Sequence, residues 1–234
     1  MKDSLEQLRK FGVAVLAGAF DRGTLASLKA AAVACFEVIE RGQPVPEHYH
    51  FNRFSNSVAL PALDDFGCTG SGRLQAPLDA AGLGVLFADV LGCPYACGLD
   101  QSWVRKKYPP RHAMHRPYHT QDWHQDGALG VRFSVEPGPP PPLTRLLTCW
   151  VPLSRCGMDS PGLEFIRCPQ RALLHFTELS DPVMRRRFAP DMFWAPELET
   201  GDALVFLNGT LHRTYLRPDM EHIRLSVEYR LFPL

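Results

Sequence analysis

Two side chains of metal-ligand type stand two positions apart near the middle of the chain, in Trp123-His124-Gln125-Asp126-Gly127. On extended backbone, residues i and i+2 face the same side, so the His124 imidazole and the Asp126 carboxylate can converge on one metal ion. A further histidine, His212, follows the strand-like run at 201–209. Two histidines and one carboxylate on one side of a metal leave its other positions open, an arrangement that suits iron(II) and reactions with dioxygen.

The His-x-Asp spacing is a weak signal when it stands alone. Nine histidines and 25 acidic residues among 234 positions predict about one His-x-acid pair by chance. Taken singly, His124 and His212 also fit as core histidines, and Asp126 fits as a turn residue before Gly127. The interpretation as a metal site therefore depends on what accompanies these residues.

The last strand-like run, residues 222–232, alternates between apolar and polar side chains. One face is apolar, as expected of a half-buried strand, and consists of Ile223, Leu225, Val227, Tyr229 and Leu231. Arg224 and Ser226 share the other face. An arginine buried without a partner costs free energy, and an anion that accepts a bidentate pair from its guanidinium removes that cost. The distal carboxylate of 2-oxoglutarate is such an anion.

The order of these features resembles the phytanoyl-CoA dioxygenase family of iron(II)/2-oxoglutarate-dependent oxygenases. The matching elements are His-Gln-Asp, then Gly-Asp-Ala-Leu-Val-Phe, then a histidine, then Arg-x-Ser about a dozen residues later. Residues 11–21, 150–154 and 162–166 are similar to strands of that family, and the resemblance covers most of residues 5–232. The family's usual Pro-Gly-Ser-His turn is replaced here by Arg167-Cys168-Pro169-Gln170-Arg171. The resemblance specifies the cofactors and not the substrate.

This resemblance implies that the two histidines and Asp126 bind Fe(II), with 2-oxoglutarate and O2 at the remaining positions and ascorbate as the reductant in vitro. It implies that Arg224 and Ser226 anchor 2-oxoglutarate and that Trp150 lies beside it, although by residue type Trp150 also fits as a core residue. The implied reaction releases succinate and CO2 and hydroxylates an unactivated C–H of a small molecule, such as an amino acid or a biosynthetic intermediate. Related halogenases have a small residue in place of the carboxylate, so Asp126 favours hydroxylation, with desaturation or ring formation as further outcomes.

The extended run that precedes the His-x-Asp segment supplies further candidates. Gln101, Trp103 and Arg105 would share one face of a strand, and we expect Gln101 to contact the cofactor. The resemblance also implies a lysine near 2-oxoglutarate from this run. Lys106 is the expected residue, and the adjacent Lys107 is the alternative register.

Other interpretations stay open at this point. The chain could bind a metal and 2-oxoglutarate as a sensor without turnover, or hold a different metal. A cupin-type metalloenzyme that does not use 2-oxoglutarate would share the barrel but would not explain Arg224-x-Ser226. Surface or substrate-contact roles are expected for the loop histidines His48, His50, His112, His115 and His119. The expected substrate lining comes from residues 48–56, 109–122 and 131–144.

Length and composition are ordinary for a globular chain. A mass of 26.2 kDa allows one domain with a sizeable core. A formal net charge of zero implies no electrostatic attraction to nucleic acid or to an anionic membrane surface. No apolar run approaches the roughly 18 residues of a membrane span, and the N-terminus lacks a signal-peptide pattern. Seven cysteines without disulfide-like spacing predict reduced thiols and a cytoplasmic location. The oligomeric state is left open.

The expected fold is mainly β with N-terminal helices, a double-stranded β-helix (jelly roll or cupin-like barrel). It would form a single oxygenase domain over residues 1–234, with a mostly helical support layer at 1–94 and the barrel at 95–234. The expected elements are a helix from Ser4 to before Gly12, a strand at 12–20, helices at 25–39 and 83–91 ending at Gly42 and Gly92, an extended run at 95–108, and loops at 109–122 and 138–142.

Overall fold

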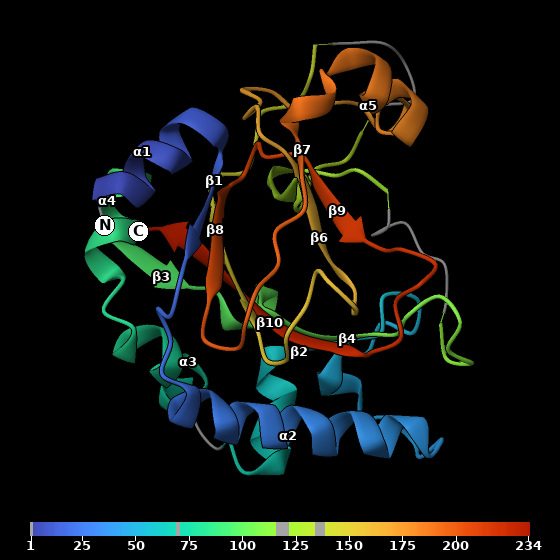
Figure 1. The fold of residues 1–234 in the computed structure, drawn as a ribbon. Coiled ribbons are helices and arrows are strands. Elements are labelled where there is room, and N and C mark those ends of the chain that lie inside the picture. Colours follow the sequence, from blue (N-terminus) through green and yellow to red (C-terminus); the bar gives the residue numbers. More distant parts are fainter. Residues whose placement is uncertain (1, 69–70, 116–121, 134–138) are drawn as a thin grey trace.

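Two antiparallel sheets and a set of helices make up the fold (Figure 1). The computed structural model describes residues 2–68, 71–115, 122–133 and 139–234. The helices are α1 (Lys2–Phe11), α2 (Arg22–Glu40), α3 (Ser71–Ala80), α4 (Gly84–Leu91) and α5 (Asp181–Arg187). The strands are β1 (Val13–Leu16), β2 (Ser57–Ala59), β3 (Tyr95–Cys97), β4 (Trp103–Lys107), β5 (Leu147–Pro152), β6 (Gly162–Ile166), β7 (Phe193–Trp194), β8 (Ala203–Leu207), β9 (His212–Tyr215) and β10 (Arg224–Pro233).

The strand order is that of a jelly roll, as expected. The larger sheet runs β1-β8-β5-β10-β4-β2, with β3 also paired to β10, and the smaller sheet runs β7-β6-β9. An isolated antiparallel bridge joins His124 to His212, so the segment that carries the His-x-Asp pair lies against the start of β9. Within the described residues, strand pairing does not close the two sheets into one continuous barrel.

The alternation of β10 separates the core from the site. Its apolar side chains Leu225, Val227, Tyr229 and Leu231 are buried in the main core, together with residues of α1, α2, α3 and α4. The helices therefore cover the outer face of the larger sheet, and the polar side chains of β10 face the smaller sheet. The Tyr229 hydroxyl donates to the Leu74 carbonyl of α3 at 3.1 Å, which links this strand to the helical layer.

Three helices end at or just before glycines that the sequence indicated as helix ends. The backbone enters the left-handed region at Gly12, Gly42 and Gly92, directly after or near the ends of α1, α2 and α4. Helix α1 starts at Lys2, so Ser4 lies inside it and is not its first residue. Strand β1 is shorter than the expected strand at 12–20 because the chain turns at Gly18, where φ is 60°.

Two parts of the N-terminal half differ from the expected elements. Helix α3 is not among the expected elements, and it contains Pro77, a residue type that disfavours a helix interior. The extended run at 95–108 is interrupted by a 3-10 turn at Leu99–Gln101, which separates β3 from β4. The expected loops at 109–122 and 138–142 contain no strand in their described parts, and residues 116–121 and 138 lie outside the described residues.

The cysteines and the lengths of the helices bear on two of the expectations from composition. All seven cysteines are free thiols. In the described ranges, no single helix is long and apolar enough to cross a membrane, although the bent pair Leu74–Ala80 and Gly84–Leu91 reaches that threshold by length and composition.

Candidate metal centre

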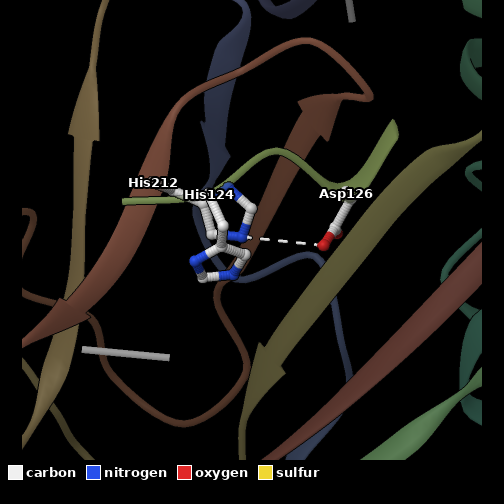
Figure 2. A group of neighbouring side chains, drawn as sticks. All are labelled: His124, Asp126 and His212. Atoms are coloured by element: carbon white, nitrogen blue, oxygen red, sulfur yellow. Dashed lines mark ion pairs between the residues drawn. The ribbon is translucent and has the colours of Figure 1, made fainter. Parts of the chain in front are cut away.

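His124, Asp126 and His212 come together where the segment before the 3-10 turn at Asp126–Ala128 meets β9 (Figure 2). Their ligand atoms all lie within 4.8 Å of one another. Gln125 has extended backbone, with φ −126° and ψ 129°, so the residues on either side of it face the same way. The spacing that the sequence presents is thus converted into a convergent set of two imidazoles and one carboxylate.

Gln125 faces away from this set and fixes the segment to the rest of the fold. Its amide nitrogen donates to the carbonyls of Ala172 and Gly209, both at 3.1 Å. Its amide oxygen accepts the Leu174 N–H at 2.8 Å. Because all three contacts are to backbone groups, the position of the metal segment does not depend on other flexible side chains.

The two imidazoles present their outer nitrogens to the centre. The Nδ1 atoms of His124 and His212 each lie 3.0 Å from a backbone carbonyl, of Asp122 and Thr210 respectively. A carbonyl can only accept, so Nδ1 carries the proton and the Nε2 lone pair is left for a metal. Burial, followed by the neighbouring His212, lowers the pKa of His124 to about 4. The imidazole is therefore neutral near pH 7, as a metal ligand requires.

The Asp126 carboxylate is buried and held through both oxygens. The Thr148 hydroxyl donates to its Oδ2 at 2.6 Å, and Arg230 Nη2 donates to its Oδ1 at 3.2 Å. Burial raises the pKa of Asp126, but Arg230, the two imidazoles and the Thr148 hydrogen bond together outweigh it and hold that pKa well below its ordinary value. The carboxylate is therefore ionised at neutral pH.

A small cavity of about 30 Å³ adjoins the triad, and its wall includes His124, His212, Trp150, Lys107 and Arg224. The two histidines of the triad and Arg224 of the expected 2-oxoglutarate anchor thus line one cavity. This volume holds only about two water molecules, at roughly 10–15 Å³ each. A dicarboxylate of five carbons would enter only if side chains of the wall rearranged.

Arg224 is 1% exposed, and its environment is incomplete. Its Nη1 donates to the Gly162 carbonyl at 3.0 Å, and its guanidinium lies 5.2 Å from the Trp150 ring centroid. Burial lowers the pKa of Arg224 to about 10, which still leaves it charged at neutral pH. Within the described structure, Arg224 Nε and the Ser226 hydroxyl are buried without a hydrogen-bond partner. Two unsatisfied donors on one face of β10 indicate a place for an anionic acceptor.

Lys106 and Gln101 lie outside the wall of the cavity that contains His124 and His212. Lys106 lies on the outer face of β4, where its ammonium pairs with Glu40 of α2. Lys107 is instead the register partner of Arg224 and lines the cavity, so the alternative register is the one formed. Gln101 is exposed in the 3-10 turn that precedes β4 and is not among the residues of the cavity wall.

Several further residues around the triad were not predicted from the sequence. Glu228 and Arg230 continue the alternation of Arg224 and Ser226 along β10, so the signal was present in the strand pattern. Arg105, which was expected to share a face with Gln101, lines the cavity and pairs with Glu228 at 3.2 Å. Thr148 gave no signal in the sequence, because only strand pairing brings it to Asp126.

Part of the expected substrate lining forms a different cavity. Residues 51 and 53–56, with Met114 and His115, border a cavity of about 270 Å³ that shares Lys107 with the small one. His48 pairs with Asp65 at 3.0 Å at the surface. His119 and residues 134–138 of the third expected segment lie outside the described residues.

The chain resembles known proteins in structure but not in sequence. No family model matches the chain, and no curated protein matches it in sequence. Apo EctD from S. alaskensis matches at 16% identity over 100% of this chain and 77% of its own, with a TM-score of 0.69. EvdO2 from Micromonospora carbonacea var. aurantiaca matches at 17% identity over 100% and 91% of the two chains, with a TM-score of 0.65. The epimerase SnoN, in complex with Fe3+, alpha ketoglutarate and nogalamycin RO, matches at 14% identity over 99% and 83%, with a TM-score of 0.63.

At these identities the likeness defines the fold alone. The chain has a fold that is also found in SnoN, which is described as a non-heme alpha ketoglutarate dependent epimerase. In this chain, that fold carries a convergent His-Asp-His set.

Proposed function

We propose that this chain is an iron(II)- and 2-oxoglutarate-dependent dioxygenase that hydroxylates a C–H bond of a small molecule. The observation that carries the proposal is one cavity that contains both His124 and His212 and the buried guanidinium of Arg224, with an unpaired Nε. A metal-only site would need the triad, but it would give no reason for an unsatisfied arginine beside it.

The residues fit both groups by their chemistry. Two neutral imidazoles and an ionised carboxylate form a donor set that suits iron(II). Arg224 and Ser226 offer a charge-assisted and a hydroxyl donor to a carboxylate, with Trp150 against the guanidinium. Lys107 lies beside Arg224 on the paired strand, where burial and the neighbouring Arg105 and Arg224 hold the pKa of its ammonium well below the ordinary value. When bound, iron and 2-oxoglutarate supply oxidation by O2 with release of succinate and CO2.

The residues of the site have two tasks, to hold the reacting groups and to limit their contact with water. The triad would hold the metal, and Arg224 with Ser226 would set the direction of the 2-oxo acid. Trp150, Leu163 and Phe206 give the wall an apolar part that limits access of water. The backbone carbonyls at the Nδ1 atoms keep both imidazoles in the ligating tautomer.

Proteins of the same fold support the assignment and show its range. SnoN is described with Fe3+ and alpha ketoglutarate, EctD with bound Fe, and SnoK as a carbocyclase. Asp126 occupies the position of a carboxylate ligand and leaves no gap there for a halide, which favours hydroxylation over halogenation in this chain. An amino acid or a biosynthetic intermediate is the proposed substrate class, and the free thiols are compatible with a reducing cytoplasm.

Cofactor binding is the first test of this proposal. Under anaerobic conditions, iron(II) and 2-oxoglutarate together should give the weak visible charge-transfer band of the chelate, and neither alone should give it. His212→Ala should abolish the band, because two remaining ligands hold iron poorly. His222→Ala is the control, since that exposed histidine pairs with Asp159 at the surface and should leave the band intact. Absence of the band in the wild-type protein at saturating cofactors would contradict the proposal and favour a cupin-type metal site.

Turnover is the second test. With iron(II), ascorbate and O2, the wild-type protein should release succinate, slowly alone and faster with a substrate from a panel of amino acids and small acids. Asp126→Ala should lose this release. Mass spectrometry of the product should show a gain of one oxygen atom, whereas loss of hydrogen or an isomer would identify desaturation or epimerisation. Binding of both cofactors without any succinate would instead identify a ligand sensor.

A further inference from the structure

The Asp126 carboxylate sits in a buried chain of charges that the proposed reaction does not by itself require. We propose that Arg230 and Thr148 are positioning residues that hold Asp126 in the orientation in which it ligates the metal, and that Glu228 fixes Arg230 for this task. This inference rests on the proposed metal site and assigns roles to three residues around it.

The first step is that both oxygens of Asp126 are restrained. Thr148 donates to Oδ2 at 2.6 Å, which occupies the oxygen that points toward β5. Arg230 Nη2 donates to Oδ1 at 3.2 Å, and His212 Nε2 lies 3.8 Å from the same oxygen. A carboxylate oxygen has two lone pairs, so Oδ1 keeps one for a metal after accepting from Arg230. Oδ2 likewise keeps one lone pair after accepting from Thr148, so the position of Oδ1 beside His212 Nε2 is what favours Oδ1 as the ligand atom.

The second step is that strand pairing brings the two donors, Thr148 and Arg230, to the same carboxylate. Thr148 of β5 and Arg230 of β10 are register partners, so they reach Asp126 side by side. The Thr148 side chain is fully buried, and Arg230 is 8% exposed. The Arg230 N–H also donates to the Ser102 hydroxyl at 3.1 Å, which fixes its backbone. Both side chains therefore approach the carboxylate from adjacent central strands of the larger sheet.

The third step is that Arg230 is itself held. Glu228 Oε1 forms an ion pair with Arg230 Nη2 at 2.9 Å, without the geometry of a hydrogen bond, and Glu228 Oε2 accepts from Arg105 Nε at 3.2 Å. The side chains therefore alternate in charge as Arg105, Glu228, Arg230 and Asp126. Arg105 and Glu228 line the small cavity, so the chain runs from the cavity wall to the metal carboxylate.

Stability alone is a poor reason for this arrangement. The desolvation of buried ion pairs offsets much of their attraction, and apolar residues of similar volume often stabilise a core as well or better. A chain of charges that ends on a metal ligand instead resembles the outer contacts that orient ligands in metal sites, whose removal typically costs about 10–100-fold in metal affinity.

Cobalt(II) titration tests the inference without turnover, because the Co(II) absorption spectrum reports the ligand set directly. Thr148→Val keeps the side-chain volume and removes the hydroxyl, and Thr148→Ser restores it. We expect Thr148→Val to raise the Kd for Co(II) about tenfold or more with an altered spectrum, and Thr148→Ser to stay near wild type. One nitrogen, Arg230 Nη2, contacts both Asp126 and Glu228. Arg230→Lys keeps the charge, but its shorter side chain does not reach the place of Nη2, so it should weaken Co(II) binding to a similar extent.

Matched controls separate positioning from folding. Thr24→Val removes a hydroxyl that donates to the exposed Asp21 carboxylate, and Arg187→Lys alters an exposed pair with Glu178. Both should leave the Kd and the spectrum unchanged. If Arg230→Lys does not fold, the double variant Arg230→Gln/Glu228→Gln removes both charges together and should show the same loss of affinity. Variants that fold, lose thermal stability and still bind Co(II) with the wild-type Kd and spectrum would overturn the inference.

The outcome is distinguishable from failure of the proposed function. If the wild-type protein binds no metal, the proposed function fails before this test begins. If it binds metal and 2-oxoglutarate but the Thr148 and Arg230 variants bind Co(II) equally well, only the positioning roles are refuted.

Discussion

At the scale of single residues, Arg224 is the side chain whose burial most needs a ligand. It is 1% exposed, and its Nε has no hydrogen-bond partner within the described residues. A charge-assisted bidentate pair in such a site is worth on the order of 2–4 kcal/mol, so Arg224→Ala should raise the Kd for 2-oxoglutarate about 30-fold or more. The Kd for the metal should change little, because Arg224 does not contact the triad. Calorimetric titration of both ligands measures the two effects separately.

Arg224→Lys keeps a positive charge but loses the planar fork and the contact with Trp150, so it should recover only part of the affinity. Arg217→Ala, which removes an exposed pair with Asp219, serves as the control. Equal affinity for 2-oxoglutarate in Arg224→Ala and wild type would place the anchor elsewhere.

At the scale of elements, the turn between β8 and β9 sets the position of His212. A Cβ added at Gly209 would lie 2.0 Å from the Gln170 carbonyl oxygen, which is backbone and cannot move aside cheaply. Gly209 also accepts from the Gln125 side chain at 3.1 Å, so the same turn supports the His-x-Asp segment. Gly209→Ala should therefore lower the free energy of unfolding by about 1–3 kcal/mol, as overpacking does, and weaken metal binding. Urea unfolding and Co(II) titration measure the two effects.

Gly84→Ala is the matched control for that substitution. Gly84 is the first residue of α4, and a Cβ there would lie 3.4 Å from the Tyr95 hydroxyl, within reach of a small adjustment. Its effect should be close to neutral or slightly stabilising. A Gly209→Ala protein as stable as Gly84→Ala would show that the 167–171 loop is free to move.

At the scale of the whole molecule, one core joins the helices to the larger sheet. Phe36 of α2 is fully buried in it, together with Cys149 and Val151 of β5. We therefore expect residues 1–234 to unfold as one domain. Phe36→Ala should cost about 3–5 kcal/mol. All four tryptophans lie at positions 103–194, so their fluorescence reports the strand-rich part, while far-UV circular dichroism reports the helices as well. Both signals should shift by the same amount.

Val33→Ala on the same helix is the control, since Val33 is 41% exposed and should change stability little. A Phe36→Ala protein in which the dichroism transition moves and the tryptophan transition stays in place would show that residues 1–94 unfold independently of the rest.

Several features of the site could be predicted from local sequence patterns. The two-residue spacing of His124 and Asp126 and the alternation of β10 depend on backbone geometry within a few residues, and so they survive in any fold that keeps those strands extended. Helix ends at Gly42 and Gly92 follow from the left-handed backbone that glycine adopts. These features determined which residue types could meet a metal and an anion.

Only the tertiary structure decided which neighbours they meet. Whether Lys106 or Lys107 faces the cavity depends on the pairing of β4 with β10, which joins residues more than a hundred positions apart. A shift of one residue would exchange the two faces of the strand. The contacts of Thr148 and Arg230 with Asp126 arise in the same way, from the register of β5 with β10, which no local pattern in the chain encodes.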